Sequence, residues 1–210
     1  MKSELSIKIL DYGSGNLRSI QKSLQEFNKR TEISSEGDDL LEADAIILPG
    51  VGAFGKAMEK LKFSNYDILI KKLVLEEKIP VLGICLGMQL LLDTSEEAIG
   101  INGLGIISGE VKKIPKQSNL TVPHTGWNIV YPMNNDIIEG YAYFNHSYYC
   151  EPTDNTIING WTYHGTRIPV IIEKDNIIGI QFHPEKSSAF GRVIIQQWIR
   201  KISNNYRLCS

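Results

Sequence analysis

A cysteine flanked by glycines is the residue of this sequence best suited to nucleophilic chemistry. Cys85 follows the apolar run 81–84, with Gly83 two residues before it and Gly87 two residues after it. This spacing is typical of the nucleophile elbow, a tight turn between a buried strand and a helix in which bulkier flanking residues would clash. The N-terminus of the helix then favours the thiolate over the thiol. A buried core cysteine is the alternative interpretation, and the pattern alone does not separate the two.

A cysteine nucleophile needs a base, and residues 179–187 supply a histidine together with a carboxylate. His183 and Glu185 are two residues apart at the end of an expected strand. If the extended backbone continues, both side chains project to the same side, so Glu185 orients the imidazole and stabilises its charged form. A structural role is the alternative for His183 taken alone. The nearby carboxylate and the distant cysteine turn favour a triad of Cys85, His183 and Glu185.

Acyl chemistry also needs hydrogen-bond donors where negative charge develops on the substrate. Residues 49–54 follow an expected parallel strand, and Gly50 and Gly52 allow the main chain to turn its N–H groups inward. The N–H of Leu86, directly after the nucleophile, is the expected second donor. Without the cysteine motif, the run around Gly50 would be only a loop.

These residues must be positioned by strands and helices that the apolar pattern predicts. In the first half, short apolar runs alternate with helical periodicity, which is typical of βαβ units and a mainly parallel sheet. Strands are expected there at 6–10, 45–48 and 81–84, and helices around 17–27, 56–60, 66–77 and 88–92. Antiparallel strands are expected later at 141–149, 157–163, 169–173 and 177–182, with a hairpin signal at Asn159-Gly160 and a final helix over about 190–202. We expect one α/β domain over residues 1–210 with three layers, in which helices flank a mainly parallel central sheet extended by antiparallel strands.

Composition and charge exclude several kinds of protein. The 210 residues are 42% hydrophobic, which is enough for a buried core and excludes a disordered chain or a disulfide-held miniprotein. The 22 Lys and Arg residues against 24 Asp and Glu give a net charge of −2 without a long basic run, so nucleic acid is not an expected partner. Three cysteines without C-x-x-C pairing, and no secretory or membrane-spanning segment, predict a cytoplasmic protein with no membrane contact.

Together these motifs resemble the class I, triad-type glutamine amidotransferases, on residues 83–89 and 181–185. A narrower resemblance is to the glutaminase subunits of imidazole glycerol phosphate synthase, of histidine biosynthesis. It rests on residues 11–17, 48–54, 122–128 and 143–148. The resemblance implies a single glutamine amidotransferase domain of flavodoxin-like, three-layer fold. It also implies an enzyme that hydrolyses glutamine to glutamate through a Cys85 thioester, without a cofactor.

The resemblance implies roles for further residues. Cys85, His183 and Glu185 match the family triad, and Gly52 matches the strand of the oxyanion site. The segments that hold glutamine are matched by Gln89, His146, Ser147 and Tyr148. The surface that meets the synthase is matched by Asn16, Trp127, Asn128 and Lys186. The implied partner is a (β/α)₈-barrel synthase subunit, which forms a heterodimer with this chain and receives ammonia through its interior.

The rest of the sequence agrees with a chain that only produces ammonia and a partner that uses it. It has no Walker-type phosphate loop, and His124, His146 and His164 lack metal-ligand spacing, so no metal site is expected. Ammonia released into water at neutral pH would mostly be protonated. A tightly docked partner that excludes water is therefore chemically sensible.

Two departures from the family lie near the expected partner surface. Thr125 stands where the family usually has methionine, and residues 160–169 differ from the shorter, glycine-rich form expected there. They keep open a paralogous role, a glutaminase subunit that supplies ammonia to a sugar amidotransferase of cell-surface glycan biosynthesis. Blocks 123–128 and 143–148 argue against a stand-alone peptidase or γ-glutamyl hydrolase. The intact triad argues against a non-catalytic interaction protein.

Overall fold

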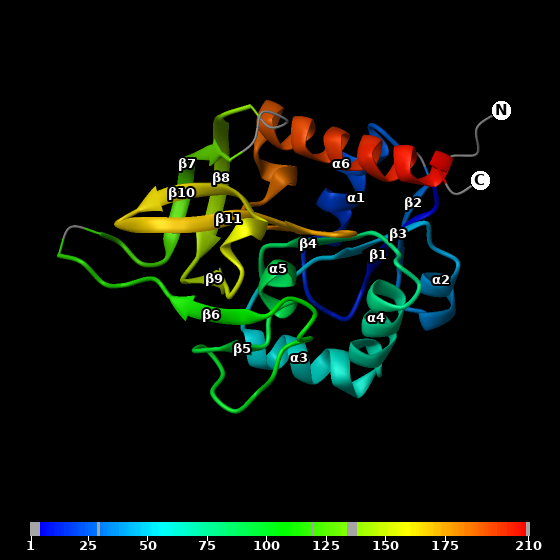
Figure 1. The fold of residues 1–210 in the computed structure, drawn as a ribbon, viewed down its shortest axis with the longest axis horizontal. Coiled ribbons are helices and arrows are strands. Elements are labelled where there is room, and N and C mark those ends of the chain that lie inside the picture. The colour runs from blue at the N-terminus through cyan, green and yellow to red at the C-terminus, as the bar shows by residue number, and fades with distance from the viewer. Residues whose placement is uncertain (1–4, 29, 119, 134–137, 209–210) are drawn as a thin grey trace.

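The computed structural model describes residues 5–28, 30–118, 120–133 and 138–208. A nine-stranded sheet in the order β2-β1-β3-β4-β12-β11-β10-β7-β8 runs through its centre, and a three-stranded sheet, β5-β6-β9, accompanies it (Figure 1). The first five strands of the large sheet are parallel, and the remaining four are joined by antiparallel pairings. The sheet therefore has a parallel and an antiparallel part, as the sequence predicted, but the strand expected at 177–182 among the antiparallel ones also pairs in parallel with the strand at 81–84.

The parallel part consists of β1 (Ile7–Leu10), β2 (Thr31–Ser34), β3 (Ala45–Leu48), β4 (Val81–Ile84) and β12 (Ile177–Ile180). Every residue of β3 and β4 is buried, as expected for strands covered by helices on both faces. Strand β12 comes from near the end of the chain, yet it pairs in parallel with β4 and sets Ile180 opposite Ile84. The segments that follow these two strands therefore lie together at the carboxyl edge of the sheet, where ligands bind in α/β folds.

The antiparallel part consists of β7 (His124–Pro132), β8 (Gly140–His146), β10 (Ile158–His164) and β11 (Thr166–Lys174). The small sheet is formed by β5 (Thr94–Ser95), β6 (Gly109–Lys113) and β9 (Tyr148–Pro152), and the 3₁₀ turn η1 (Asn155–Ile157) follows it. The strand expected at 141–149 is thus two strands, which separate at Ser147 and enter different sheets.

The hairpin expected at Asn159-Gly160 is wrong. Both residues lie inside β10, where the pairing with β11 is irregular around Gly160. A Cβ atom on Gly160 would lie only 3.0 Å from the Ile171 side chain, so this glycine permits a close approach rather than a turn. The turn between β10 and β11 is made by Gly165, whose φ is +70°.

Helices cover both faces of the large sheet (Figure 1). One face carries α1 (Leu17–Gln25) and α6 (Ser188–Leu208). The other carries α2 (Gly37–Leu41), α3 (Phe54–Phe63), α4 (Tyr66–Leu75) and α5 (Leu86–Leu90). In β3, Ile46 and Leu48 pack with the α3 and α4 side, and Ala45 and Ile47 with the α1 and α6 side. The three-layer α/β prediction is confirmed, whereas a single domain over 1–210 stays a prediction.

None of the helices within the described ranges combines the length and the apolar character needed to cross a bilayer.

Candidate active site

Cys85 lies in the turn between β4 and α5, in a strained backbone conformation. Its φ is +54° and its ψ is −107°, a combination that side-chain-bearing residues rarely adopt. A Cβ atom on Gly83 would lie 2.9 Å from the amide nitrogen of Met88, and one on Gly87 would lie 1.8 Å from the carbonyl oxygen of Leu48. Both glycines are therefore required by close backbone approach, as the nucleophile-elbow interpretation predicts.

The other cysteines are not placed for chemistry. Cys150 in β9 is fully buried, and burial raises the pKa of its thiol. Cys209 lies outside the described residues. Within the part of the chain that the structure describes, Cys85 is the cysteine that faces a cavity.

His183 and Glu185 form the expected pair, but by a different route. Strand β12 ends at Ile180, so the condition that the extended backbone continues through Glu185 is not met. Instead, the 3₁₀ turn η2 (Pro184–Lys186) brings Glu185 back, with Oε1 3.0 Å from Nδ1 of His183. The two side chains are 5% and 1% exposed. The backbone N–H of His183 donates to the carbonyl of Tyr143 at 3.0 Å, which fixes the imidazole relative to β8.

The electrostatic environment favours a charged His183. Burial alone would lower its pKa, but hydrogen bonds with Cys85 and Glu185 outweigh burial and raise the pKa from 6.5 to about 10. The second oxygen of Glu185, Oε2, is buried without a hydrogen-bond partner among the described residues. The carboxylate therefore directs its hydrogen bonding to His183. At neutral pH the imidazole beside the Cys85 sulfur is therefore charged.

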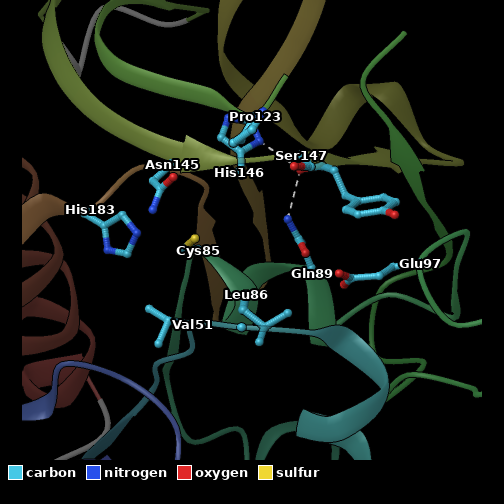
Figure 2. Close-up of a pocket in the computed structure, with 12 residues that line it drawn as sticks. Val51, Cys85, Leu86, Gln89, Glu97, Pro123, Asn145, His146, Ser147 and His183 are labelled. Atoms are coloured by element: carbon cyan, nitrogen blue, oxygen red, sulfur yellow. Dashed lines mark hydrogen bonds between the residues drawn. The ribbon is translucent and has the colours of Figure 1, made fainter. Parts of the chain in front are cut away.

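A small cavity of about 240 Å³ opens beside the Cys85 sulfur. Figure 2 shows the sulfur between the His183 ring on one side and Gln89 on the other. Of the residues expected at the substrate, the cavity is lined by Gly52, Leu86, Gln89, His146, Ser147 and Tyr148, but not by Gly50. Sequence reasoning missed four other lining residues, namely Val51, Glu97, Pro123 and Asn145.

Glu97 is the one acidic side chain among the described residues that line this cavity. Its Oε2 accepts a hydrogen bond from the backbone N–H of Phe54 at 2.8 Å, at the start of α3. This bond holds the carboxylate across the cavity from the triad (Figure 2). No local sequence pattern marks Glu97, because it lies in an irregular segment after β5.

The wall of the cavity is built on a chain of hydrogen bonds between histidines. His146 Nδ1 lies 2.8 Å from the carbonyl oxygen of Tyr148, His146 Nε2 lies 3.0 Å from His124 Nδ1, and His124 Nε2 lies 3.1 Å from the amide nitrogen of Asn128. A carbonyl only accepts, so Nδ1 of His146 donates and its Nε2 accepts from His124. Nε2 of His124 then accepts from Asn128. The chain connects the cavity to a residue expected at the partner surface.

Both rings must be neutral for this chain to form. Burial lowers the pKa of His124 to about 3, with help from His146, and lowers that of His146 to about 4. His164 stacks on His124 with ring centroids 4.0 Å apart, and its Nε2 lies 2.9 Å from the carbonyl of Thr121. The fold thus gathers three histidines that are scattered in the sequence. Among the described residues, no group of three or more His, Cys, Asp or Glu is arranged to hold a metal ion.

The orientation of the Gly50–Val51 peptide determines which backbone N–H groups point towards Cys85. Its carbonyl oxygen accepts from the N–H of Leu86 at 3.3 Å, and its N–H donates to Oγ of Ser14 at 3.4 Å. Ser14 also donates to the carbonyl of Val51 at 2.7 Å. In this conformation the Leu86 N–H is engaged by the loop itself, so the expected pair of oxyanion donors is not assembled.

The residues expected at the partner surface are largely exposed. Trp127 is 54% exposed and packs edge-on against Tyr143, with ring centroids 6.2 Å apart. The Lys186 ammonium lies 5.5 Å from the centre of the same Tyr143 ring. Asn16 is exposed at the start of α1, and Asn128 is half-buried. Trp127, Tyr143 and Lys186 therefore form one cluster next to His183.

The departure at Thr125 also lies near the cavity. Its hydroxyl donates to Oδ1 of Asn145 at 3.1 Å, across the β7–β8 pair. Asn145 lines the cavity, so position 125 contacts the cavity wall from the exposed side of the sheet. Residues 160–169, the other departure, form most of the β10–β11 hairpin.

Comparisons with known proteins agree with this geometry. A family model described as "Glutamine amidotransferase class-I" matches residues 8–202. The chain is 46% identical over 199 residues to the imidazole glycerol phosphate synthase subunit HisH of Methanocaldococcus jannaschii, covering 92% of this chain and 98% of the relative. It is 41% identical over 203 residues to the HisH subunit of Bacillus subtilis, covering 92% and 95%.

Solved structures with little sequence similarity have the same fold. A crystal structure titled as a glutamine amidotransferase superposes with a TM-score of 0.76 at 14% identity, covering 95% of this chain and 99% of the other. A putative GMP synthase subunit from Thermoplasma acidophilum gives 0.68 at 21% identity, covering 99% and 98%. From the family model and the relatives above 40% identity, the chain belongs to the class I glutamine amidotransferases, and within them to the HisH subunits of imidazole glycerol phosphate synthase.

Proposed function

We propose that the chain is the glutaminase subunit of an imidazole glycerol phosphate synthase and supplies ammonia for histidine biosynthesis. The observation that carries the proposal is Cys85 at a strained strand-to-helix turn, facing a small cavity beside the His183–Glu185 pair. Family membership adds the substrate, because its members release ammonia from glutamine. The free state of Cys85 and Cys150 supports a reducing compartment, and we place the reaction in the cytoplasm.

The reaction follows from the placement of the triad. The Cys85 thiolate attacks the side-chain amide carbon of glutamine and forms a carbon–sulfur bond. His183 gives its proton to the departing nitrogen, the carbon–nitrogen bond breaks, and ammonia leaves a thioester on Cys85. A water molecule then attacks the thioester while His183 takes its proton, which releases glutamate and restores the thiolate. Glu185 stabilises the imidazolium at both stages.

The cavity fits a free amino acid better than a peptide or a sugar acceptor. Its volume of about 240 Å³ lies below the usual range for larger ligands. We infer that the Glu97 carboxylate binds the α-ammonium group of glutamine, and that Ser147 and Gln89 hold its polar atoms. This arrangement argues against a peptidase, whose substrate would have to continue beyond the amino group.

The exposed residues around the triad support a docked partner. We infer that a (β/α)₈-barrel synthase binds the surface of Asn16, Trp127, Asn128 and Lys186 and receives the ammonia there. Docking would also act on the Gly50–Val51 peptide, since turning this peptide would free the Leu86 N–H and bring the Val51 N–H to the oxyanion site. The relatives named above are synthase subunits, and no contact among the described residues favours the sugar-amidotransferase alternative.

Covalent labelling tests the proposed chemistry. A diazo-ketone analogue of glutamine should alkylate Cys85, as measured by mass spectrometry of the intact chain and of its Cys85 peptide. Cys85→Ala should abolish labelling, and Cys150→Ala should leave it unchanged because that thiol is buried in β9. Labelling that survives in Cys85→Ala would refute the assignment.

A further inference from the structure

We propose that Gln181 is a further catalytic residue, whose side-chain amide donates a hydrogen bond to the Cys85 sulfur and stabilises it as a thiolate. The hydrogen bond rests on geometry, and its catalytic use rests on the proposed glutaminase function. Gln181 lies in the segment that predicted His183 as the base. Neither the residue type nor the spacing of Gln181 indicated a role for Gln181 itself.

The sheet register brings Gln181 to the cysteine although the two are 96 residues apart in the chain. The parallel pairing of β12 with β4 sets Ile180 opposite Ile84, and the backbone N–H of Cys85 donates to the Ile180 carbonyl at 2.8 Å. The next residue, Gln181, is fully buried, and its Nε2 lies 3.6 Å from the Cys85 sulfur. This distance is suitable for an N–H to sulfur hydrogen bond.

The orientation of the Gln181 amide follows from the Tyr148 carbonyl, which can only accept hydrogen bonds. Gln89 places its Nε2 3.0 Å from the Tyr148 carbonyl oxygen, so the nitrogen of Gln89 must point there. The same nitrogen lies 3.0 Å from Oε1 of Gln181, which accepts its second hydrogen. Oε1 of Gln181 is thereby fixed against Gln89, and the Nε2 donor faces the sulfur. Two buried glutamines thus form a relay from a backbone carbonyl to the nucleophile.

The charge around the sulfur gives this donor its effect. His183 supplies a positive charge, and burial keeps the Tyr12 hydroxyl and the Cys150 thiol uncharged, since it raises the pKa of both. Other titratable groups among the described residues near the cavity are the neutral His146, Tyr148, whose pKa is raised by burial, Glu97 on the cavity wall, and Glu185 behind His183. A hydrogen bond to an ionised acceptor is much stronger than one to a neutral acceptor. Gln181 therefore favours the thiolate over the thiol.

The same donor acts at the second stage of the reaction. When water attacks the thioester, the carbon–sulfur bond breaks and the electron pair returns to the Cys85 sulfur. The Gln181 N–H is already in place to stabilise that developing charge, without reorganisation of the cavity. A nonpolar residue of similar size, such as methionine, would fill the space but would offer no donor.

Alkylation of Cys85 by iodoacetamide as a function of pH tests the hydrogen bond without any glutaminase activity. In the full-length chain, with alkylation followed on the Cys85 peptide by mass spectrometry, Gln181→Met should move the pH midpoint of reaction upward by about one unit. Gln181→Glu, which is nearly isosteric, should move it at least as far, because a carboxylate repels the thiolate. At a pH below the wild-type midpoint, both variants should react about tenfold more slowly.

Thr162→Val is the matched control, because Thr162 is equally buried and donates to the Ile129 carbonyl at 2.6 Å, away from the cysteine. An unchanged midpoint in folded Gln181→Met or Gln181→Glu would overturn the proposal, and so would an equal shift in Thr162→Val. In the glutaminase assay at neutral pH we expect kcat of Gln181→Met to fall about tenfold, with little change in KM. A wild-type chain without glutaminase activity would refute the proposed function, whereas the alkylation midpoint would still decide the hydrogen bond.

Discussion

Replacing Ser14 by alanine tests whether the loop before α3 restrains catalysis. Ser14 is the acceptor for the Val51 N–H at 3.4 Å, and this N–H belongs to the same peptide whose carbonyl occupies the Leu86 N–H. Turning the peptide would break both bonds and expose two donors to the substrate. Ser14→Ala removes the bond to the Val51 N–H in advance, together with the bond of 2.7 Å that Ser14 donates to the Val51 carbonyl, so it should favour the turned state.

The size of the effect follows from the strength of that bond. A neutral hydrogen bond contributes about 0.5–1.5 kcal/mol, and one at 3.4 Å lies in the lower part of that range. The turned state should therefore gain about two- to fivefold in population, and the basal kcat should rise by the same factor. The full gain available from an oxyanion donor is about 10²–10³ in kcat, so most of the restraint should remain for the partner to remove.

The assay measures glutamate formation with and without the ligand-loaded (β/α)₈-barrel partner. We expect the basal rate of Ser14→Ala to rise about two- to fivefold, the partner-stimulated rate to stay unchanged, and their ratio to fall accordingly. Ser23→Ala is the control, since Ser23 bonds the Ile20 carbonyl within α1 and does not contact the loop.

Two results would refute this reasoning. If the basal and stimulated rates of Ser14→Ala fell together, Ser14 would support the active state rather than the resting one. If the wild-type chain turned over glutamine equally fast with and without its partner, the Gly50–Val51 peptide would not limit the reaction in the first place.

Two further predictions concern stability. Gly87→Ala should lower the free energy of unfolding by about 3 kcal/mol, because the new Cβ would lie 1.8 Å from the Leu48 carbonyl oxygen. Gly37→Ala, whose Cβ would meet only the end of a leucine side chain, should change it by less than about 0.5 kcal/mol in the same urea titration, and equal effects would contradict the argument. Folding lowers the pKa values of His124 and His146. The free energy of unfolding should therefore be highest above pH 6.5 and should decrease as the pH falls towards 4. At pH 5 we expect a loss of about 2 kcal/mol per ring. His124→Asn should halve that loss in urea titrations at pH 7 and 5, whereas an unchanged pH dependence would exclude the ring as its source.

Strands β1, β3 and β4 and the turn at Cys85 were predictable because their signals are local, whereas β2 was not expected and β12 was expected only among the antiparallel strands. Strands β3 and β4 are continuous apolar runs, and the glycines around Cys85 mark a turn that tolerates nothing larger. Strand β7 was missed because most of its nine residues are polar, aromatic or only partly buried, which hides the alternation of a half-buried strand. The Asn159-Gly160 signal failed because a glycine that permits close approach looks the same in sequence as one that permits a turn.

The candidate site shows the same division between local and distant signals. The pairing of His183 with Glu185 was foreseen, although its geometry is a 3₁₀ turn rather than an extended strand. Glu97 and Ser14 could not be found from sequence, since each acquires its position from a loop far away in the chain. Their roles depend on contacts between segments, and no spacing within either segment encodes such contacts.

The β4–β12 pairing explains why this site can form at all. Strand β12 lies between β4 of the parallel part and β11 of the antiparallel part, and it pairs in parallel with β4. One register therefore sets three positions at once, namely Cys85 after β4, and Gln181 and His183 after β12. A slip of one residue in this pairing would turn Gln181 away from the sulfur and move His183 with it. The proposed nucleophile, hydrogen-bond donor and base thus depend on a single strand pairing, and any substitution that weakens this pairing should reduce activity before it unfolds the chain.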